Sequence, residues 1–250
     1  SYGIFCSDLV CYPDTGINPK GDSMLKKIGV TEERRIMLYI SDTISLKSDS
    51  LTAEDSSGPT ILLGSRLNLL PQKDQSLGEK CIDVFLDGYL KYVKSGGEAN
   101  LKLFKKGENA KEVINWSKEH GLEKKIIVEK QVPLATFYKH IRSANIIADS
   151  FGQNTMPGMV TTDSYALGKP VIANLRNDIF GSNEIPKLPG LNAASSDEVY
   201  HQLCKAMKDT KLLEELGQQS RRFAVKYLSP EENAKRLLKK VKSIVKENTT

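Results

Sequence analysis

The sequence predicts an α/β protein in which a parallel β-sheet carries helices on both faces. From about residue 58 onward, short apolar runs alternate with segments whose apolar residues recur at helical spacing. Runs such as "TILLG" and "PVIAN" are apolar almost throughout, which is typical of parallel strands buried on both sides. Strands and helices that alternate over short connections form parallel sheets with helices on both faces.

The first fifty or so residues are less regular. The elements expected there are a strand at residues 7–12, a helix at 22–30 and a strand at 34–40. A Ser-, Asp- and Thr-rich stretch without an apolar period follows and is typical of a linker. We place a domain boundary near residues 46–58, which divides the chain into residues 1–50 and 51–250.

The regular part begins after this boundary. Strands are expected at residues 60–64, 99–107, 124–130, 145–150 and 170–174. Helices are expected at 79–95, 108–121 and 133–144, from Gly158 to Gly168, and at 195–209, 211–228 and 230–248. Gly121 and Gly168 stand where helices end, Pro170 cannot continue a helix, and Pro230 suits the first turn of the last helix.

Composition narrows the function classes. The 36 Lys and Arg residues exceed the 31 Asp and Glu residues by 5, which suits an anionic ligand or a membrane surface but is too small an excess to argue for nucleic acid. The four cysteines lack zinc or redox spacing, so a reduced, cytoplasmic setting is expected. No metal and no cofactor are expected.

Ligands of open parallel sheets bind beyond the carboxyl ends of the strands. The first suggestive loop there is "GSRLNLLPQK", where Gly64 and Ser65 allow close backbone approach and Arg66 and Lys73 follow. An arginine fork and a lysine point charge together suit a diphosphate. Two basic residues in a loop are also typical of solvated surface.

Two further loops complete the candidate site. Asp149 ends a strand, and the first N–H groups of the next helix form an anion site. These groups belong to Gly158, Met159, Val160 and Thr161. Asp163, one turn further on, suits the two hydroxyls of a ribose. The loop "VEKQVP", with Gln131 and Val132, offers backbone groups to a base.

The three loops, in this order, resemble the C-terminal half of the group 1 (family 4) glycosyltransferases, which are retaining enzymes of the two-domain GT-B architecture. "GSRLNLLPQK" is similar to the family's Gly-Arg-Leu loop with its lysine, and "DSYALGKPVIA" to its second acidic motif and the strand after it. The likeness runs from about residue 58 to 230. It implies a Rossmann-like donor-binding domain, with residues 1–45 the tail of an acceptor-binding domain.

The resemblance also implies roles and shows departures. The helix of "TTDSYALG" would hold the donor's phosphates, with Asp163 in place of the family's second glutamate. Thr155 stands where the first glutamate usually touches the donor sugar, and Asp149 is similar to an acid of a related subgroup. The catalytic set is therefore Arg66, Lys73 and Asp163.

The sequence thus predicts a hexosyltransferase that takes a sugar from a UDP-, GDP- or ADP-sugar to a sugar, glycan or lipid acceptor. Activity is not expected of this chain alone, because the cleft of the fold forms between two domains. A non-catalytic binding subunit with the same fold and a sugar epimerase of the same architecture remain alternatives. The last helix combines an apolar stripe with many lysines, so peripheral contact with an anionic membrane is a further hypothesis.

Overall fold

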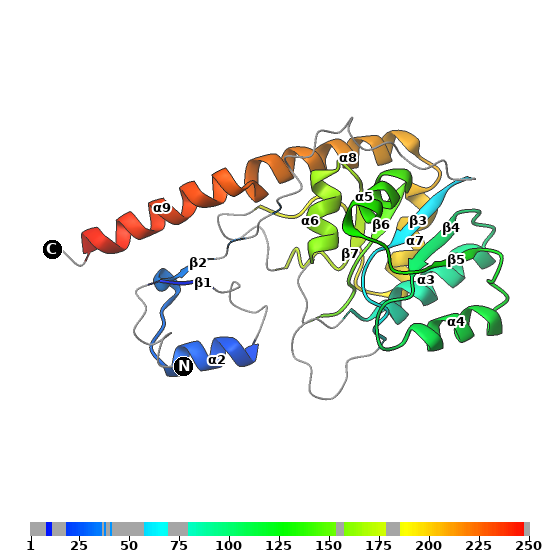
Figure 1. The fold of residues 1–250 in the computed structure, drawn as a ribbon, viewed down its shortest axis with the longest axis horizontal. Coiled ribbons are helices and arrows are strands. Elements are labelled where there is room, and N and C mark those ends of the chain that lie inside the picture. The colour runs from blue at the N-terminus through cyan, green and yellow to red at the C-terminus, as the bar shows by residue number, and fades with distance from the viewer. Residues whose placement is uncertain are drawn as a thin grey trace.

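The computed structural model describes residues 9–11, 19–36, 38, 41, 58–69, 80–153, 158–178 and 186–247. The main body is a six-stranded parallel sheet with strand order β5-β4-β3-β6-β7-β8 (Figure 1). The strands are β3 (Thr60–Leu63), β4 (Asn100–Phe104), β5 (Ile126–Glu129), β6 (Ile146–Ala148), β7 (Val171–Ala173) and β8 (Leu191–Asn192). The predicted α/β class with a parallel sheet is confirmed.

Seven α-helices of the described part accompany this sheet and extend from it. They are α3 (Ile82–Lys94), α4 (Ala110–Glu119), α5 (Leu134–Ser143), α6 (Met159–Ala166), α7 (Ser196–Ala206), α8 (Thr210–Phe223) and α9 (Pro230–Glu247). A π-helical turn, Ala224–Leu228, joins α8 to α9. Among the described residues, no helix is both long and apolar enough to cross a membrane.

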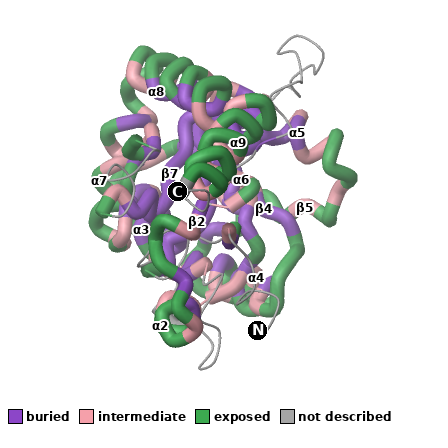
Figure 2. The backbone as a smooth tube through the Cα atoms, turned by 90° about the vertical axis from the view of Figure 1, so that its left-hand side faces the viewer, coloured by how far each residue is buried: buried purple, intermediate pink, exposed green. Residues whose placement is uncertain are grey.

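Successive side chains of β3 point to opposite faces of the sheet, and apolar residues on both faces require helices on both sides. Ile61 and Leu63 belong to a core formed with α3, α4 and α7, whereas Leu62 belongs to a second core formed with α5, α6 and the π-helical turn. All three side chains are 0% exposed. The buried residues are concentrated in the sheet and in the helix faces against it (Figure 2).

Local signals set several helix ends. Ser195 caps α7 by accepting from the Glu198 N–H, and the Glu198 carboxylate accepts in return from the Ser195 N–H. Asp209 caps α8 through the Leu212 N–H at 3.0 Å. Gly168 has a φ of 69°, which confirms that the glycine after α6 adopts the left-handed conformation of a helix stop.

The described N-terminal residues form a small unit of their own. Strands β1 (Val10–Cys11) and β2 (Arg35–Ile36) pair in parallel, and α2 (Pro19–Lys27) connects them. Val10, Leu25 and Val30 form its core, and Arg35 pairs with Asp22 at 3.2 Å. The predicted domain boundary falls near residues 46–58, and residues 42–57 lie outside the described part of the chain. The division into 1–50 and 51–250 therefore stays a prediction.

Two features were not predicted from the sequence. Strand β8 has two residues, too few to show a period, and it forms because Leu191 and Asn192 pair with Ile172 and Ala173 of β7. The π-helical turn interrupts what the sequence suggests is a continuous helix to residue 228.

Candidate functional site

The site lies where the sheet changes direction. Successive strands are added outward from β3 through β4 to β5, and the chain then returns to the other side of β3 to form β6. The carboxyl ends of β3 and β6 therefore flank the switch point at which doubly wound folds bind ligands. β3 runs into Gly64, and β6 runs into Asp149.

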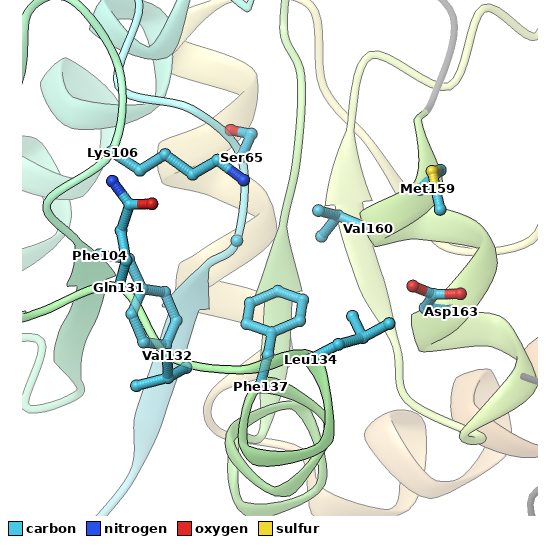
Figure 3. Close-up of a pocket in the computed structure, with 11 residues that line it drawn as sticks. Ser65, Phe104, Lys106, Gln131, Val132, Leu134, Phe137, Met159, Val160 and Asp163 are labelled. Carbon is cyan, nitrogen blue, oxygen red and sulfur yellow. The ribbon is translucent and has the colours of Figure 1, made fainter.

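A pocket of about 320 Å³ opens at this end of the sheet (Figure 3). Loops after β3, β4 and β5 and the first turns of α5 and α6 supply its walls. Its lining residues are Gly64, Ser65, Phe104, Lys106, Gln131, Val132, Leu134, Phe137, Met159, Val160 and Asp163.

The structure brings together residues from all three predicted loops. Those of the predicted set that line the pocket are Gly64, Ser65, Gln131, Val132, Met159, Val160 and Asp163. They are separated by up to a hundred residues of sequence and share one cavity because parallel strands present their carboxyl ends at the same edge. Their roles as ligand contacts stay predictions.

Gly64 is needed where it stands. A Cβ atom at this position would lie 2.6 Å from Val160 Cγ1 and 3.2 Å from Phe137 Cζ. Any side chain there would therefore push against the wall of the pocket.

Asp163 is the fifth residue of α6 and is 3% exposed. Its side chain belongs to the pocket wall next to Met159 (Figure 3). The position suits a carboxylate that accepts hydrogen bonds from hydroxyl groups of a ligand.

Asp149 does not line the pocket but organises its edge. Its carboxylate is fully buried and accepts from the Gly158 N–H at 2.9 Å and from the Thr161 hydroxyl at 2.7 Å. The Ser150 hydroxyl donates to it at 3.1 Å, and the Lys80 ammonium pairs with it at 3.5 Å. Asp149 thus ties the end of β6 to the beginning of α6.

This network changes the anion site expected at α6. The N–H of Gly158 is already bonded to Asp149, so the site is left to the next three N–H groups. Helix geometry gives the N–H groups of Met159, Val160 and Thr161 no acceptor within the helix. They carry the positive end of the helix dipole toward the pocket.

Lys80 is a cation near the site that the sequence analysis did not identify. Its ammonium contacts Ser150 Oγ at 3.0 Å, and it would lie 3.3 Å from a Cβ atom at Gly158. Its backbone is held by the Phe151 N–H, which donates to the Lys80 carbonyl at 2.8 Å. The available signal was its place two residues before α3.

Four described residues of the predicted set do not line the pocket, namely Arg66, Asp149, Gly158 and Thr161. Arg66 is exposed and follows Ser65 on the same loop, without lining the cavity. Lys73 and Thr155 lie outside the described residues.

The apolar part of the pocket was also missed. Phe104 and Phe137 meet edge to face with ring centroids 5.5 Å apart, and Leu134 lies beside them in the first turn of α5. Within the described ranges, no group of three or more His, Cys, Asp or Glu side chains is placed to hold a metal ion.

Comparison with known proteins places the fold. No protein-family model matches the sequence, and no curated protein matches it. Solved structures do match. S. aureus TarM, in a complex with fondaparinux, α-GlcNAc-glycerol and UDP, superposes with a TM-score of 0.67 at 14% identity over 93% of this chain and 43% of that one.

Two further matches have the same character. The pneumococcal O-GlcNAc transferase GtfA, solved with UDP and GlcNAc, gives a TM-score of 0.61 at 16% identity over 98% of this chain and 47% of that one. Anabaena Alr3699/HepE, solved with UDP and glucose, gives 0.62 at 13% identity over 95% of this chain and 64% of that one. This chain therefore spans less than two thirds of the length of each of these structures, between 43% and 64%.

These neighbours are glycosyltransferases of GT-B architecture, and the six-stranded sheet with its flanking helices matches their Rossmann-like domains. The predicted Rossmann-like fold is confirmed.

Proposed function

We propose that this chain is the donor-binding part of a glycosyltransferase. The enzyme would transfer a hexose from a nucleotide-diphosphate sugar to a sugar, glycan or lipid acceptor with retention of configuration. One observation carries the proposal: a single pocket at the switch point joins a glycine loop, the beginning of α6 and a buried carboxylate, Asp163. These are the groups that a diphosphate and a ribose need.

The proposed roles follow from the placement of each group. The N–H groups at the beginning of α6 and the Lys80 ammonium hold the diphosphate, and Arg66 reaches it from the β3 loop. When the glycosidic bond breaks, negative charge develops on the leaving diphosphate, and these preorganised donors stabilise it. Lys73 remains the second cation predicted from the sequence. Thr155 and Asp149 are proposed to act near the donor sugar, Asp149 through its hold on Gly158 and Thr161.

Calorimetry with UDP, GDP and ADP, their sugar conjugates and pyrophosphate tests the proposal. A hydrogen bond to a charged group contributes about 1.5–3 kcal/mol, so Arg66→Ala should weaken both nucleotide and pyrophosphate about 10- to 150-fold. Asp163→Asn should weaken the nucleotide while leaving pyrophosphate almost unchanged, because only the nucleotide has a ribose.

Lys80→Met and Lys73→Met form a matched pair in the same assay. We expect the larger loss of pyrophosphate affinity for Lys80→Met, because its ammonium lies beside the beginning of α6. Melting temperatures must accompany these titrations, since Lys80 also pairs with Asp149. Nucleotide affinity unchanged in Arg66→Ala, Lys80→Met and Lys73→Met would overturn the proposed site. The chain should also be assayed together with an acceptor-binding domain. Sugar transfer to the acceptor would support the glycosyltransferase over a non-catalytic subunit. Epimerisation of the nucleotide sugar without an acceptor would favour the epimerase.

The proposed setting is the cytoplasmic face of an anionic membrane, contacted through α9. An apolar stripe on this helix faces solvent, with Leu238 54%, Val241 40% and Val245 57% exposed. A row of exposed lysines runs beside it. The row consists of Lys235, Lys239, Lys242 and Lys246. An exposed apolar stripe bordered by cations on one helix suits an interface with anionic lipid.

Vesicle flotation tests this contact. The chain should float with vesicles that contain anionic lipid and not with zwitterionic ones, and Leu238→Ser with Val241→Ser should abolish flotation. Val225→Ser is the matched control, because Val225 is 46% exposed outside the stripe. Equal recovery with both vesicle types would rule the contact out.

A further inference from the structure

The loop after β4 brings a lysine over the pocket. Its backbone is fixed to the β3 loop, because the Leu67 N–H donates to the Lys106 carbonyl at 2.7 Å and the Asn109 N–H donates to the Leu67 carbonyl at 3.0 Å. Gly107 has a φ of 119°, and a Cβ atom there would lie 2.5 Å from the Leu67 nitrogen. The position of Lys106 relative to Ser65 is therefore set by the backbone.

The side chain of Lys106 extends across the pocket toward Ser65, and the amide of Gln131 lies near it (Figure 3). Among the residues that the structure describes, none accepts a hydrogen bond from the Lys106 ammonium or forms an ion pair with it. An ammonium has three donors and no acceptor. Lys106 is exposed, so its ammonium is accessible to an acceptor atom of a ligand in the pocket.

The strand order indicates which part of a nucleotide lies beside Lys106. The phosphate groups belong at α6, which follows β6, whereas Lys106 follows β4. β3 separates β4 from β6, so the backbone of Lys106 and the beginning of α6 are two strand spacings apart, about 10 Å, and the Lys106 side chain extends into the space between them (Figure 3). An extended nucleotide bound by its phosphates at α6 would place its base near β4 and β5.

The surroundings of Lys106 suit the base as well. Phe104, Phe137 and Val132 form an apolar surface that can carry the face of an aromatic ring. Lys106 and Gln131 lie at the rim of that surface, where the polar edge of the ring would point. The ammonium offers donors only, so it favours a carbonyl oxygen at this edge and opposes an amino group.

We propose that Lys106 makes the site selective for bases that present a carbonyl at this edge, namely uracil and guanine over cytosine and adenine. Uracil and cytosine differ along one edge of the ring, where uracil has an oxygen acceptor beside an N3–H donor and cytosine has an amino donor beside an unprotonated N3. UDP and CDP are therefore a matched pair of ligands, and GDP and ADP are a second pair. This inference rests on the proposed nucleotide site.

Calorimetry with UDP, CDP, GDP, ADP and pyrophosphate tests this base selectivity. The titrations compare the wild-type chain with the variants Lys106→Met and Lys105→Met. The wild type should bind UDP at least about 10-fold more tightly than CDP, which is the effect of one hydrogen bond from a charged donor. Lys106→Met should lower UDP affinity to that of CDP while CDP and pyrophosphate change little. Lys105→Met, an exposed neighbour that does not line the pocket, should retain the preference and controls for the lost charge.

Three results would contradict the inference. Equal wild-type affinity for UDP and CDP would exclude selection by a carbonyl. A parallel loss of UDP, CDP and pyrophosphate affinity in Lys106→Met, but not in Lys105→Met, would show that Lys106 contacts phosphate instead. Failure of every nucleotide to bind the wild-type chain would overturn the proposed function and this inference with it.

Discussion

Asp149→Asn is the perturbation that best separates a supporting role from direct contact with a ligand. The Asp149 carboxylate is 0% exposed and has four partners, namely the Gly158 N–H, the hydroxyls of Thr161 and Ser150 and the Lys80 ammonium. An asparagine keeps one acceptor oxygen for the beginning of α6. Its amino group would then face Ser150 and Lys80, so the ion pair is lost and a donor replaces an acceptor.

The expected cost follows from these contacts. The lost pair is largely buried, since the Lys80 side chain is only 18% exposed. Removing a buried acceptor of charge-assisted hydrogen bonds lowers the free energy of unfolding by about 2–4 kcal/mol. For a chain of this size, each kcal/mol corresponds to about 2–4 °C, so the melting temperature should fall by roughly 5–15 °C.

Urea and thermal unfolding measure the effect, and nucleotide titration at low temperature measures binding. Thr161→Val is the matched control, because it removes one donor to the carboxylate and should cost about 1–2 kcal/mol. Stability within about 0.5 kcal/mol of the wild type, combined with loss of nucleotide binding, would refute the supporting role and make Asp149 a ligand contact.

Two further predictions concern other parts of the body. Gly88→Ala should destabilise the chain by about 1–2 kcal/mol in urea, because the overpacking cost exceeds the gain in helix propensity. The new Cβ would lie 2.5 Å from Val199 Cβ and 2.7 Å from the Ser196 carbonyl oxygen. A stabilised variant would contradict this prediction. Burial lowers the pKa of Lys169 to about 8, with a smaller effect from Arg142. The unfolded chain then binds more protons between about pH 8 and 10, so stability should rise with pH over this range by up to roughly 2 kcal/mol, and Lys169→Met should remove that rise.

The sequence by itself determined the elements that depend on neighbours along the chain. The apolar run of β3 predicts a strand buried on both sides, and all of its residues are buried in the structure. Gly168 and Ser195 predict a helix stop and a helix start, and both are observed. These signals depend on backbone conformation and hydrogen bonds within a few residues, so they can be recognised without knowing the fold. The order of the loops was also sufficient to suggest the edge of the sheet where the pocket lies.

The tertiary structure alone decided which side chains meet at that edge. Lys106 and Phe104 look like ordinary residues at the end of a strand, and they reach the pocket only because β4 lies next to β3. Asp149 resembles a ligand contact in the sequence, yet it is buried against Lys80 and the beginning of α6. Such contacts depend on the spacing and register of strands that are distant in sequence. Residue type and local pattern carry no information on those distances, because they are set by the packing of the whole sheet.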